Sequence, residues 1–240
     1  MNIAIVGYGK MGKIIEEVAI SRGHAVNVKI DLNNLHDFNR DVFSAIDVTI
    51  EFTGPHTAFD NVMKCLEMNM PVVCGSTGWL ERLPDIENLC ANNNGSFLYA
   101  SNFSVGVNIF FEINKHLARL MSGQPQYEID IKEIHHTQKK DAPSGTAITL
   151  AEQIIENAPR KDKWVNTQSN SSNELEIVSE RMNPYPGWHE VNYHSDIDEI
   201  KIVHNAFNRN GFALGAVLAA EFIHGKNGIF TMKDVLGFGN

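Results

Sequence analysis

The first hundred residues alternate short apolar runs with segments in which apolar residues recur every three or four positions. The short runs predict β-strands, and the segments with helical spacing predict amphipathic helices. Strands that alternate with helices indicate a parallel sheet joined by right-handed crossovers, which is a doubly wound α/β domain. The predicted strands cover residues 2–6, 24–30, 46–52, 70–74 and 96–99, and the predicted helices cover 11–22 and 56–68.

After residue 104 the pattern changes to longer segments that alternate between apolar and polar positions, which predicts an α+β domain with an open, antiparallel or mixed sheet. The segment 126–136 is typical, with apolar residues at Tyr127, Ile129, Ile131 and Ile134. The change of pattern therefore predicts two domains, with a boundary near residue 104. In this second half the predicted strands cover 126–136, 175–181, 188–194 and 199–207, the predicted helices cover 105–121, 144–157 and 211–224, and the polar segment 161–173 predicts a mobile loop.

Composition narrows the classes of protein to consider. The chain has 240 residues, of which 43% are hydrophobic and 20% charged, as in globular proteins. The 29 acidic residues outnumber the 20 basic ones, giving a net charge of −9, which argues against nucleic acid as a partner. No apolar run approaches the ~20 residues of a membrane span, and the N-terminus does not resemble a signal peptide.

Cysteine usage indicates a reducing compartment. The three cysteines, Cys65, Cys74 and Cys90, are odd in number and lack C-x-x-C spacing. A disulfide framework or a zinc site is therefore not expected, and no acidic cluster indicates another metal. We expect a cytoplasmic protein without a metal.

Residues 7–12 form a G-x-G-x-x-G turn between the first predicted strand and the first predicted helix. Gly7 suits the tight turn, Gly9 lets a pyrophosphate approach the backbone, and Gly12 lets the helix pack on the strand. Asp31, at the end of the second strand, is placed to accept hydrogen bonds from the ribose hydroxyls of the cofactor. Its carboxylate charge favours NAD over NADP. Lys10 offers a nearby cation that could offset this preference. The alternative is a glycine-rich turn that binds no cofactor.

Two further turns follow predicted strands, at 52–55 and 75–78. In a doubly wound sheet the ligand binds outside the carboxyl ends of the strands, so these turns are candidates for cofactor contacts. The alternative is that both are ordinary connections between a strand and a helix.

The segment 133–147 carries the most chemistry. A predicted strand ends at two adjacent histidines, two lysines follow, and a Pro-Ser-Gly-Thr turn opens a helix. The helix start suits a carboxylate, a lysine supplies a cation, and histidines can transfer protons. Taken singly, these residues could equally be polar residues at a strand end, a solvated loop and a helix N-cap. The candidate residues are His135, His136, Lys139, Ser144, Gly145 and Thr146.

With these motifs the chain resembles the 4-hydroxy-tetrahydrodipicolinate reductase (dihydrodipicolinate reductase) family over essentially its whole length. The 133–147 string is highly specific for that family. The motifs that carry the resemblance are VGYGKMG at 6–12, EFTGPHTA at 51–58, VVCGSTGW at 72–79, ASNFSVGVN at 100–108, EIHHTQKKDAPSGTA at 133–147 and IVHNAFNRNGFALGAV at 202–217.

The resemblance implies hydride transfer from NADH or NADPH to a cyclic unsaturated dicarboxylate in lysine and diaminopimelate biosynthesis. It implies that 1–104 with 210–240 is a Rossmann-type dinucleotide-binding domain, and that 105–209 binds substrate and assembles a homotetramer. His135 and Lys139 would be the acid/base pair, and His136, Ser144, Gly145 and Thr146 would bind substrate carboxylates. The residues implied to border the cofactor are Gly7, Tyr8, Gly9, Lys10, Met11, Gly12, Asp31, Phe52, Thr53, Gly75, Ser76, Thr77, Ala100, Ser101, Asn102 and Phe103.

Two other functions are compatible with a dinucleotide fold. One is another two-domain NAD(P)-dependent dehydrogenase, although Cys65 and Cys74 lie in apolar segments and suit no nucleophile of an acylating enzyme. The other is a non-catalytic, NAD-binding redox regulator, which would have no need of Lys139 close to His135.

Overall fold

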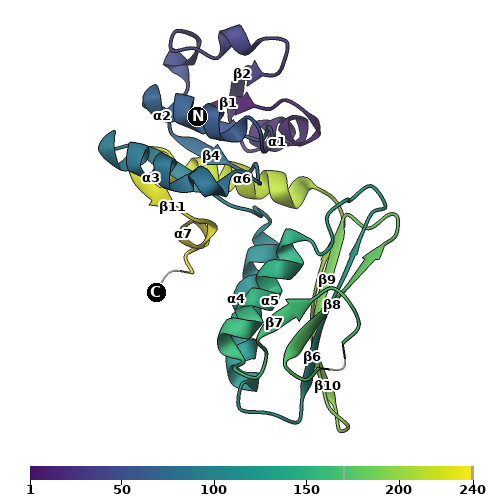
Figure 1. The fold of residues 1–240 in the computed structure, drawn as a ribbon. Coiled ribbons are helices and arrows are strands. Elements are labelled where there is room, and N and C mark those ends of the chain that lie inside the picture. The colour runs from purple at the N-terminus through teal and green to yellow at the C-terminus, as the bar shows by residue number, and fades with distance from the viewer. Residues whose placement is uncertain (170, 239–240) are drawn as a thin grey trace. The chain divides into compact units, whose positions relative to one another are not determined.

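The computed structural model describes residues 1–169 and 171–238 and divides into two compact units (Figure 1). The first unit combines Met1–Val105 with the chain from Arg209 onward, and the second is Gly106–Asn208. Each unit has its own sheet and its own hydrophobic core. No helix among the described residues is long and apolar enough to cross a membrane.

The first unit contains a six-stranded parallel sheet in the order β11-β5-β4-β3-β1-β2. The strand order reverses between β1 and β3, which makes the carboxyl ends of these two strands the expected ligand-binding edge. Val6 pairs with both Ile30 of β2 and Glu51 of β3, so the three strands end at the same level. The strands are β1 (Asn2–Val6), β2 (Ala25–Ile30), β3 (Val48–Glu51), β4 (Val72–Cys74), β5 (Ser96–Tyr99) and β11 (Gly228–Phe230).

Two buried clusters cover the two faces of this sheet. The helices α1 (Lys10–Ser21) and α6 (Asn210–Ile223) contribute to one cluster, and α2 (Ala58–Glu67) and α3 (Leu83–Asn92) contribute to the other. The sheet is therefore doubly wound, with its carboxyl edge left for loops. Shorter helices are η1 (Leu35–Asp37), η2 (Val42–Ala45), η3 (Leu80–Arg82) and α7 (Met232–Leu236).

The second unit contains a five-stranded mixed sheet in the order β10-β9-β6-β8-β7. The strands β10, β9 and β6 pair antiparallel, whereas β6, β8 and β7 pair parallel. The helices α4 (Val105–Met121) and α5 (Gly145–Asn157) pack on one face, as Figure 1 shows. The strands are β6 (Glu128–His135), β7 (Lys163–Val165), β8 (Glu174–Arg181), β9 (Gly187–His194) and β10 (Glu199–Ala206).

The predicted fold class is confirmed, with a parallel Rossmann-type sheet followed by an open mixed sheet. Part of the loop prediction for 161–173 is wrong, because β7 lies within it; Asn170 of that segment lies outside the described residues. The helices α3 and α7 and the strand β11 were not predicted. Three residues of β11 are too few to show a periodic pattern, so that strand is fixed by its pairing with β5.

Candidate active site

The glycine turn follows β1 at the point where the strand order reverses. Gly7 has a φ of +97°, and a Cβ atom there would lie 2.4 Å from the carbonyl oxygen of Phe52, so only glycine fits. Gly9 caps the N-terminus of α1, and a Cβ atom there would have no neighbour within 4 Å. The turn thus keeps its own backbone tight at Gly7 and leaves space beside the helix start at Gly9.

A cavity of about 550 Å³ opens at this edge of the sheet. Its walls include apolar side chains from the segment after β2, and the Asp31 side chain is exposed at that point, with Oδ1 accepting a hydrogen bond from Leu32 N at 2.8 Å. A glycine cradle, a helix N-terminus and a carboxylate are the features that a dinucleotide requires, so the residues present fit that cofactor. The cavity brings together five predicted residues, Gly7, Gly9, Asp31, Phe52 and Thr53.

The other predicted cofactor residues occupy neighbouring positions in the first unit. Lys10, Met11 and Gly12 form the first turn of α1, and the Tyr8 hydroxyl donates to Glu16. The segments with Gly75, Ser76 and Thr77, and with Ala100, Ser101, Asn102 and Phe103, follow β4 and β5. Cys74 pairs with both Glu51 and Tyr99, so these loops leave the sheet at the same edge as the cavity.

Sequence reasoning missed a residue that links two of these loops. The side chain of Glu51 is fully buried at the end of β3 and accepts hydrogen bonds from Thr53 N at 2.9 Å and from Cys74 Sγ at 3.0 Å. Its backbone oxygen accepts from Gly75 N at 2.9 Å. Glu51 therefore fixes the loops after β3 and β4 relative to each other.

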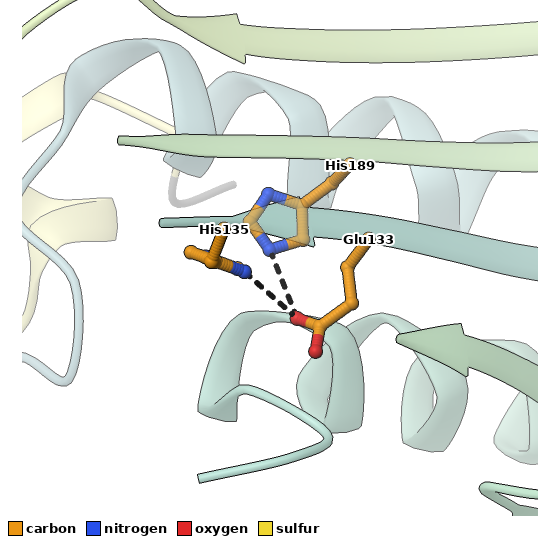
Figure 2. Close-up of side chains that lie close together, drawn as sticks. All are labelled: Glu133, His135 and His189. Atoms are coloured by element: carbon orange, nitrogen blue, oxygen red, sulfur yellow. Dashed lines mark ion pairs between the residues drawn. The ribbon is translucent and has the colours of Figure 1, made fainter. Parts of the chain in front are cut away.

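A second polar cluster lies in the second unit, where β6 ends (Figure 2). Glu133 pairs with His189 across β6 and β9, and His135 lies two residues further on the same face. Glu133 Oε2 is 3.3 Å from His135 Nδ1 and 3.7 Å from His189 Nε2. All three residues are at most 6% exposed, and Figure 2 shows the carboxylate facing both rings.

Burial sets the charge of both histidines. Removal from water lowers the pKa of His135 to about 4; Glu133 opposes this shift, whereas Lys139 and Arg181 add to it. Burial lowers the pKa of His189 to about 3, with a further contribution from His135. Both rings are therefore neutral at neutral pH, and each has one nitrogen able to accept a proton.

The turn after β6 carries the predicted lysine. Lys139 Nζ donates to Asp141 Oδ2 at 2.8 Å, and Arg181 holds the same turn by donating to the backbone oxygens of Lys139 at 3.3 Å and Asp141 at 2.5 Å. Arg181 Nη2 also lies 3.3 Å from Glu133 Oε1. The lysine turn and the buried carboxylate thus share one guanidinium.

The predicted helix start is α5. Ser144 is its N-cap: Oγ accepts from Ala147 N at 3.2 Å and lies 3.2 Å from His189 Nε2, while Ser144 N donates to both oxygens of Glu133. Gly145 and Thr146 form the first helical turn, and His136 is half-buried just after β6. The structure therefore groups His135, the lysine turn and the α5 N-terminus around Glu133.

Glu133, His135 and His189 also have donor atoms within 4.8 Å of one another, a spacing that a metal ion could use. However, the two oxygens of Glu133 already accept hydrogen bonds from Ser144 N, and the Arg181 guanidinium lies against Oε1. The guanidinium repels a metal ion at the same place, so the surroundings of Glu133 suit a hydrogen-bonded carboxylate better than a metal ligand.

Sequence reasoning quoted Glu133 without giving it a role, and it did not single out Arg181, Gly187 or His189. A Cβ atom at Gly187 would lie 3.3 Å from His135 Nε2, so this glycine leaves space beside the ring. Alternation gave a signal for Glu133, because it follows Ile129 and Ile131 on the buried face of β6. The local sequence pattern carried no such signal for Arg181 and His189, because these residues reach the cluster only through strand pairing.

A Rossmann-type unit whose cavity fits a dinucleotide, and a second unit with a buried His–Glu cluster, are features of a nicotinamide-dependent oxidoreductase. Family models agree over both units: "Dihydrodipicolinate reductase, N-terminus" matches residues 1–103 and "Dihydrodipicolinate reductase, C-terminus" matches residues 106–236. The chain belongs to the dihydrodipicolinate reductase family, now called 4-hydroxy-tetrahydrodipicolinate reductase. The resemblance, the reductase function and the enzyme class predicted from the sequence are confirmed.

Individual relatives give the same assignment. A 4-hydroxy-tetrahydrodipicolinate reductase of Christiangramia forsetii is 48% identical over 240 residues, covering 98% of each chain. One of Neisseria meningitidis serogroup B is 33% identical, covering 100% of this chain and 98% of its own.

Solved structures support the fold. A dipicolinate-bound dihydrodipicolinate reductase from Paenisporosarcina has a TM-score of 0.77 at 23% identity, covering 98% of each chain. An amine dehydrogenase from Mycobacterium smegmatis has a TM-score of 0.63 at 10% identity, covering 97% of this chain and 95% of its own. At these identities the likeness shows a shared fold, which several dehydrogenases use.

Proposed function

We propose that this chain transfers a hydride from NADH or NADPH to C4 of a cyclic unsaturated dicarboxylate, giving tetrahydrodipicolinate, with His135 and Lys139 as the acid/base pair. The observation that carries this proposal is the placement of a buried histidine, a lysine turn and a helix N-terminus around one carboxylate. This cluster lies within the part of the chain that matches the C-terminal family model.

The cofactor, when bound, supplies the hydride. Gly7, Gly9 and the N-terminus of α1 suit its pyrophosphate, because N–H groups at a helix start attract an anion. Asp31 suits the ribose hydroxyls of the adenosine half, and its carboxylate supports NADH over NADPH by repelling a 2′-phosphate.

The second unit supplies substrate binding and the proton. The N-terminus of α5, at Ser144, Gly145 and Thr146, suits one substrate carboxylate, and His136 suits the other. Hydride addition leaves negative charge in the ring, so a proton must follow. We assign its delivery to the ammonium of Lys139, with His135, neutral at rest, as the partner that accepts or relays a proton.

We further propose a cytoplasmic homotetramer. The helices α4 and α5 cover one face of the second sheet, while the opposite face carries the half-exposed Val178 and Val203. An open sheet face of this kind is available for self-association. The three cysteines are free and buried, which suits a reducing compartment. Light scattering should give a mass four times the 26.8 kDa of the chain.

The test is an assay with the condensation product of pyruvate and aspartate semialdehyde, following oxidation of NADH and of NADPH. His135→Ala and Lys139→Ala should lower turnover by at least ~100-fold while nucleotide affinity stays within about twofold. Lys140→Ala, at the exposed next position, is the matched control and should retain turnover. Nucleotide binding without turnover by the wild-type chain would indicate a regulator instead.

A further inference from the structure

The carboxylate of Glu133 has no exposed surface, yet it contacts four polar groups. An isolated buried charge is costly, so a protein keeps one where its contacts compensate for the cost. We propose that Glu133 is a positioning residue that fixes His135, the lysine turn and the start of α5 in one arrangement, with Arg181 as its counter-ion. This inference rests on the proposed function, because these three groups act together only in that reaction.

The first contact orients His135. Glu133 Oε2 lies 3.3 Å from Nδ1, an electrostatic contact outside hydrogen-bond geometry, and a negative charge there favours the tautomer with its hydrogen on Nδ1. The accepting lone pair is then on Nε2, on the side where Gly187 leaves space for the ring. Glu133 thereby selects which nitrogen of His135 can take part in proton transfer.

The second contact fixes the start of α5. Ser144 N donates to Glu133 Oε1 at 3.1 Å and to Oε2 at 3.2 Å. Ser144 is the N-cap of α5, so the carboxylate sets where the helix begins relative to β6. The proposed carboxylate-binding end of the helix is thus tied to the strand that carries His135.

The third contact reaches Lys139 through Arg181. The guanidinium lies 3.3 Å from Glu133 Oε1 and donates to the backbone oxygens of Lys139 and Asp141. One planar cation therefore neutralises the buried carboxylate and holds the turn that carries the lysine. If Glu133 served stability alone, it would need a counter-ion such as Arg181. That counter-ion would not also need to hold the turn that carries Lys139.

Glu133→Gln tests the proposal, because glutamine keeps the size of the side chain and an acceptor oxygen for Ser144 N but removes the charge. We expect turnover to fall roughly 100-fold, the lower end of what a positioned proton-transfer group contributes, with NADH affinity unchanged and a folded protein. The acid limb of the pH–rate profile should move to lower pH, because the variant loses the charge that favours protonated His135. Lys139 and Arg181, which disfavour protonation, remain, as does Asp141, which favours it. The neighbouring ring of His189, with a pKa of about 3, stays neutral at the pH where His135 titrates. The limb reports only the charge beside His135, so the turnover of a variant with restored stability is what separates positioning from a structural role.

Glu128→Gln is the matched control, because Glu128 is an exposed carboxylate at the far end of the same strand, paired with Lys161 at 3.3 Å. It should leave turnover and the pH profile unchanged. Arg181→Met should lower the unfolding midpoint, and adding Glu133→Gln should restore the midpoint but not turnover.

Wild-type turnover and an unchanged pH profile in Glu133→Gln would overturn this proposal alone. Turnover restored together with stability in the double variant would also overturn it, since the role would then be structural. Turnover lost on treatment with EDTA and restored by Zn²⁺ would overturn it in favour of a metal site. An inactive wild-type chain would instead overturn the proposed function.

Discussion

Glu133 Oε2 lies 3.7 Å from His189 Nε2 across the paired strands β6 and β9, and both side chains are almost fully buried. The histidine nevertheless stays neutral at neutral pH, because burial lowers its pKa to about 3. His135, beside the same carboxylate, has a pKa of about 4. The fold thus holds two uncharged histidines at the candidate site. Protonation of either ring at low pH places a charge in a buried position and disfavours the folded state.

Stability should therefore fall in mild acid. Both folded-state pKa values lie below the ordinary histidine value of 6.5, so the unfolded chain binds more protons below that value. The contribution of neutral histidines is complete above pH ~6.5 and is lost as the pH falls toward 4 and 3, by up to ~1.4 kcal/mol per pH unit for each ring. Urea unfolding between about pH 7.5 and 5 measures this loss. His189→Gln should make the slope of the unfolding free energy against pH shallower. His36→Gln, at an exposed site, should leave that slope unchanged. Equal slopes in the wild-type chain and both variants would contradict the prediction.

Gly187→Ala should impair catalysis without affecting the cofactor. The new Cβ atom would lie 3.3 Å from His135 Nε2, so the ring must shift by a few tenths of an ångström. Small displacements of a reacting group are costly, and we expect turnover to fall about tenfold with NADH affinity unchanged. Steady-state kinetics and a fluorescence titration with NADH measure the two effects. Gly123→Ala is the control, because a Cβ atom there meets nothing within 4 Å. A Gly187→Ala variant as fast as the control would show that His135 Nε2 tolerates the contact.

Gly7→Ala and Gly9→Ala should separate folding from nucleotide binding. Alanine at position 7 would have a positive φ and a clash with the Phe52 backbone at 2.4 Å, so we expect a loss of at least ~2 kcal/mol of stability. Alanine at position 9 has open space in the protein, so stability should be retained while its methyl group hinders the pyrophosphate and weakens NADH binding about tenfold or more. Thermal unfolding and NADH titration give both quantities. Normal NADH affinity in Gly9→Ala would place the pyrophosphate elsewhere.

The alternation of apolar and polar residues predicted the two sheets because burial on one or both faces of a strand leaves a local trace. The same pattern misplaced one residue of β6. The apolar set Tyr127, Ile129, Ile131 and Ile134 breaks the period of two, since Glu133 rather than Ile134 lies on the face of Ile131. A charged residue in phase with buried isoleucines indicates a functional position, and strict counting would have shown it.

The rest of the candidate site could not be predicted from local pattern. Arg181 and His189 meet Glu133 because β8 and β9 both pair with β6, and pairing between strands about fifty residues apart depends on the whole sheet. Glu51 was equally hidden, because its role depends on the distance from Cys74 on the neighbouring strand. The 133–147 motif gave His135 and Lys139 as candidates and the resemblance gave their roles, whereas the structure shows what surrounds them.

Asp31 should decide between the two nicotinamide cofactors. Its exposed carboxylate follows β2 and lines the cavity, where a 2′-phosphate on the adenosine ribose would bring two negative charges together. We therefore expect the wild-type chain to bind NADH more tightly than NADPH, and Asp31→Asn to raise the affinity for NADPH relative to NADH about tenfold or more. Titration of both proteins with both cofactors gives the ratio. Asp41→Asn, at an exposed carboxylate that does not line the cavity, is the control and should leave the ratio unchanged. Tighter binding of NADPH than of NADH by the wild-type chain would contradict the prediction. In that case Lys10→Ala should weaken the affinity for NADPH alone, because Lys10 is the cation in the first turn of α1.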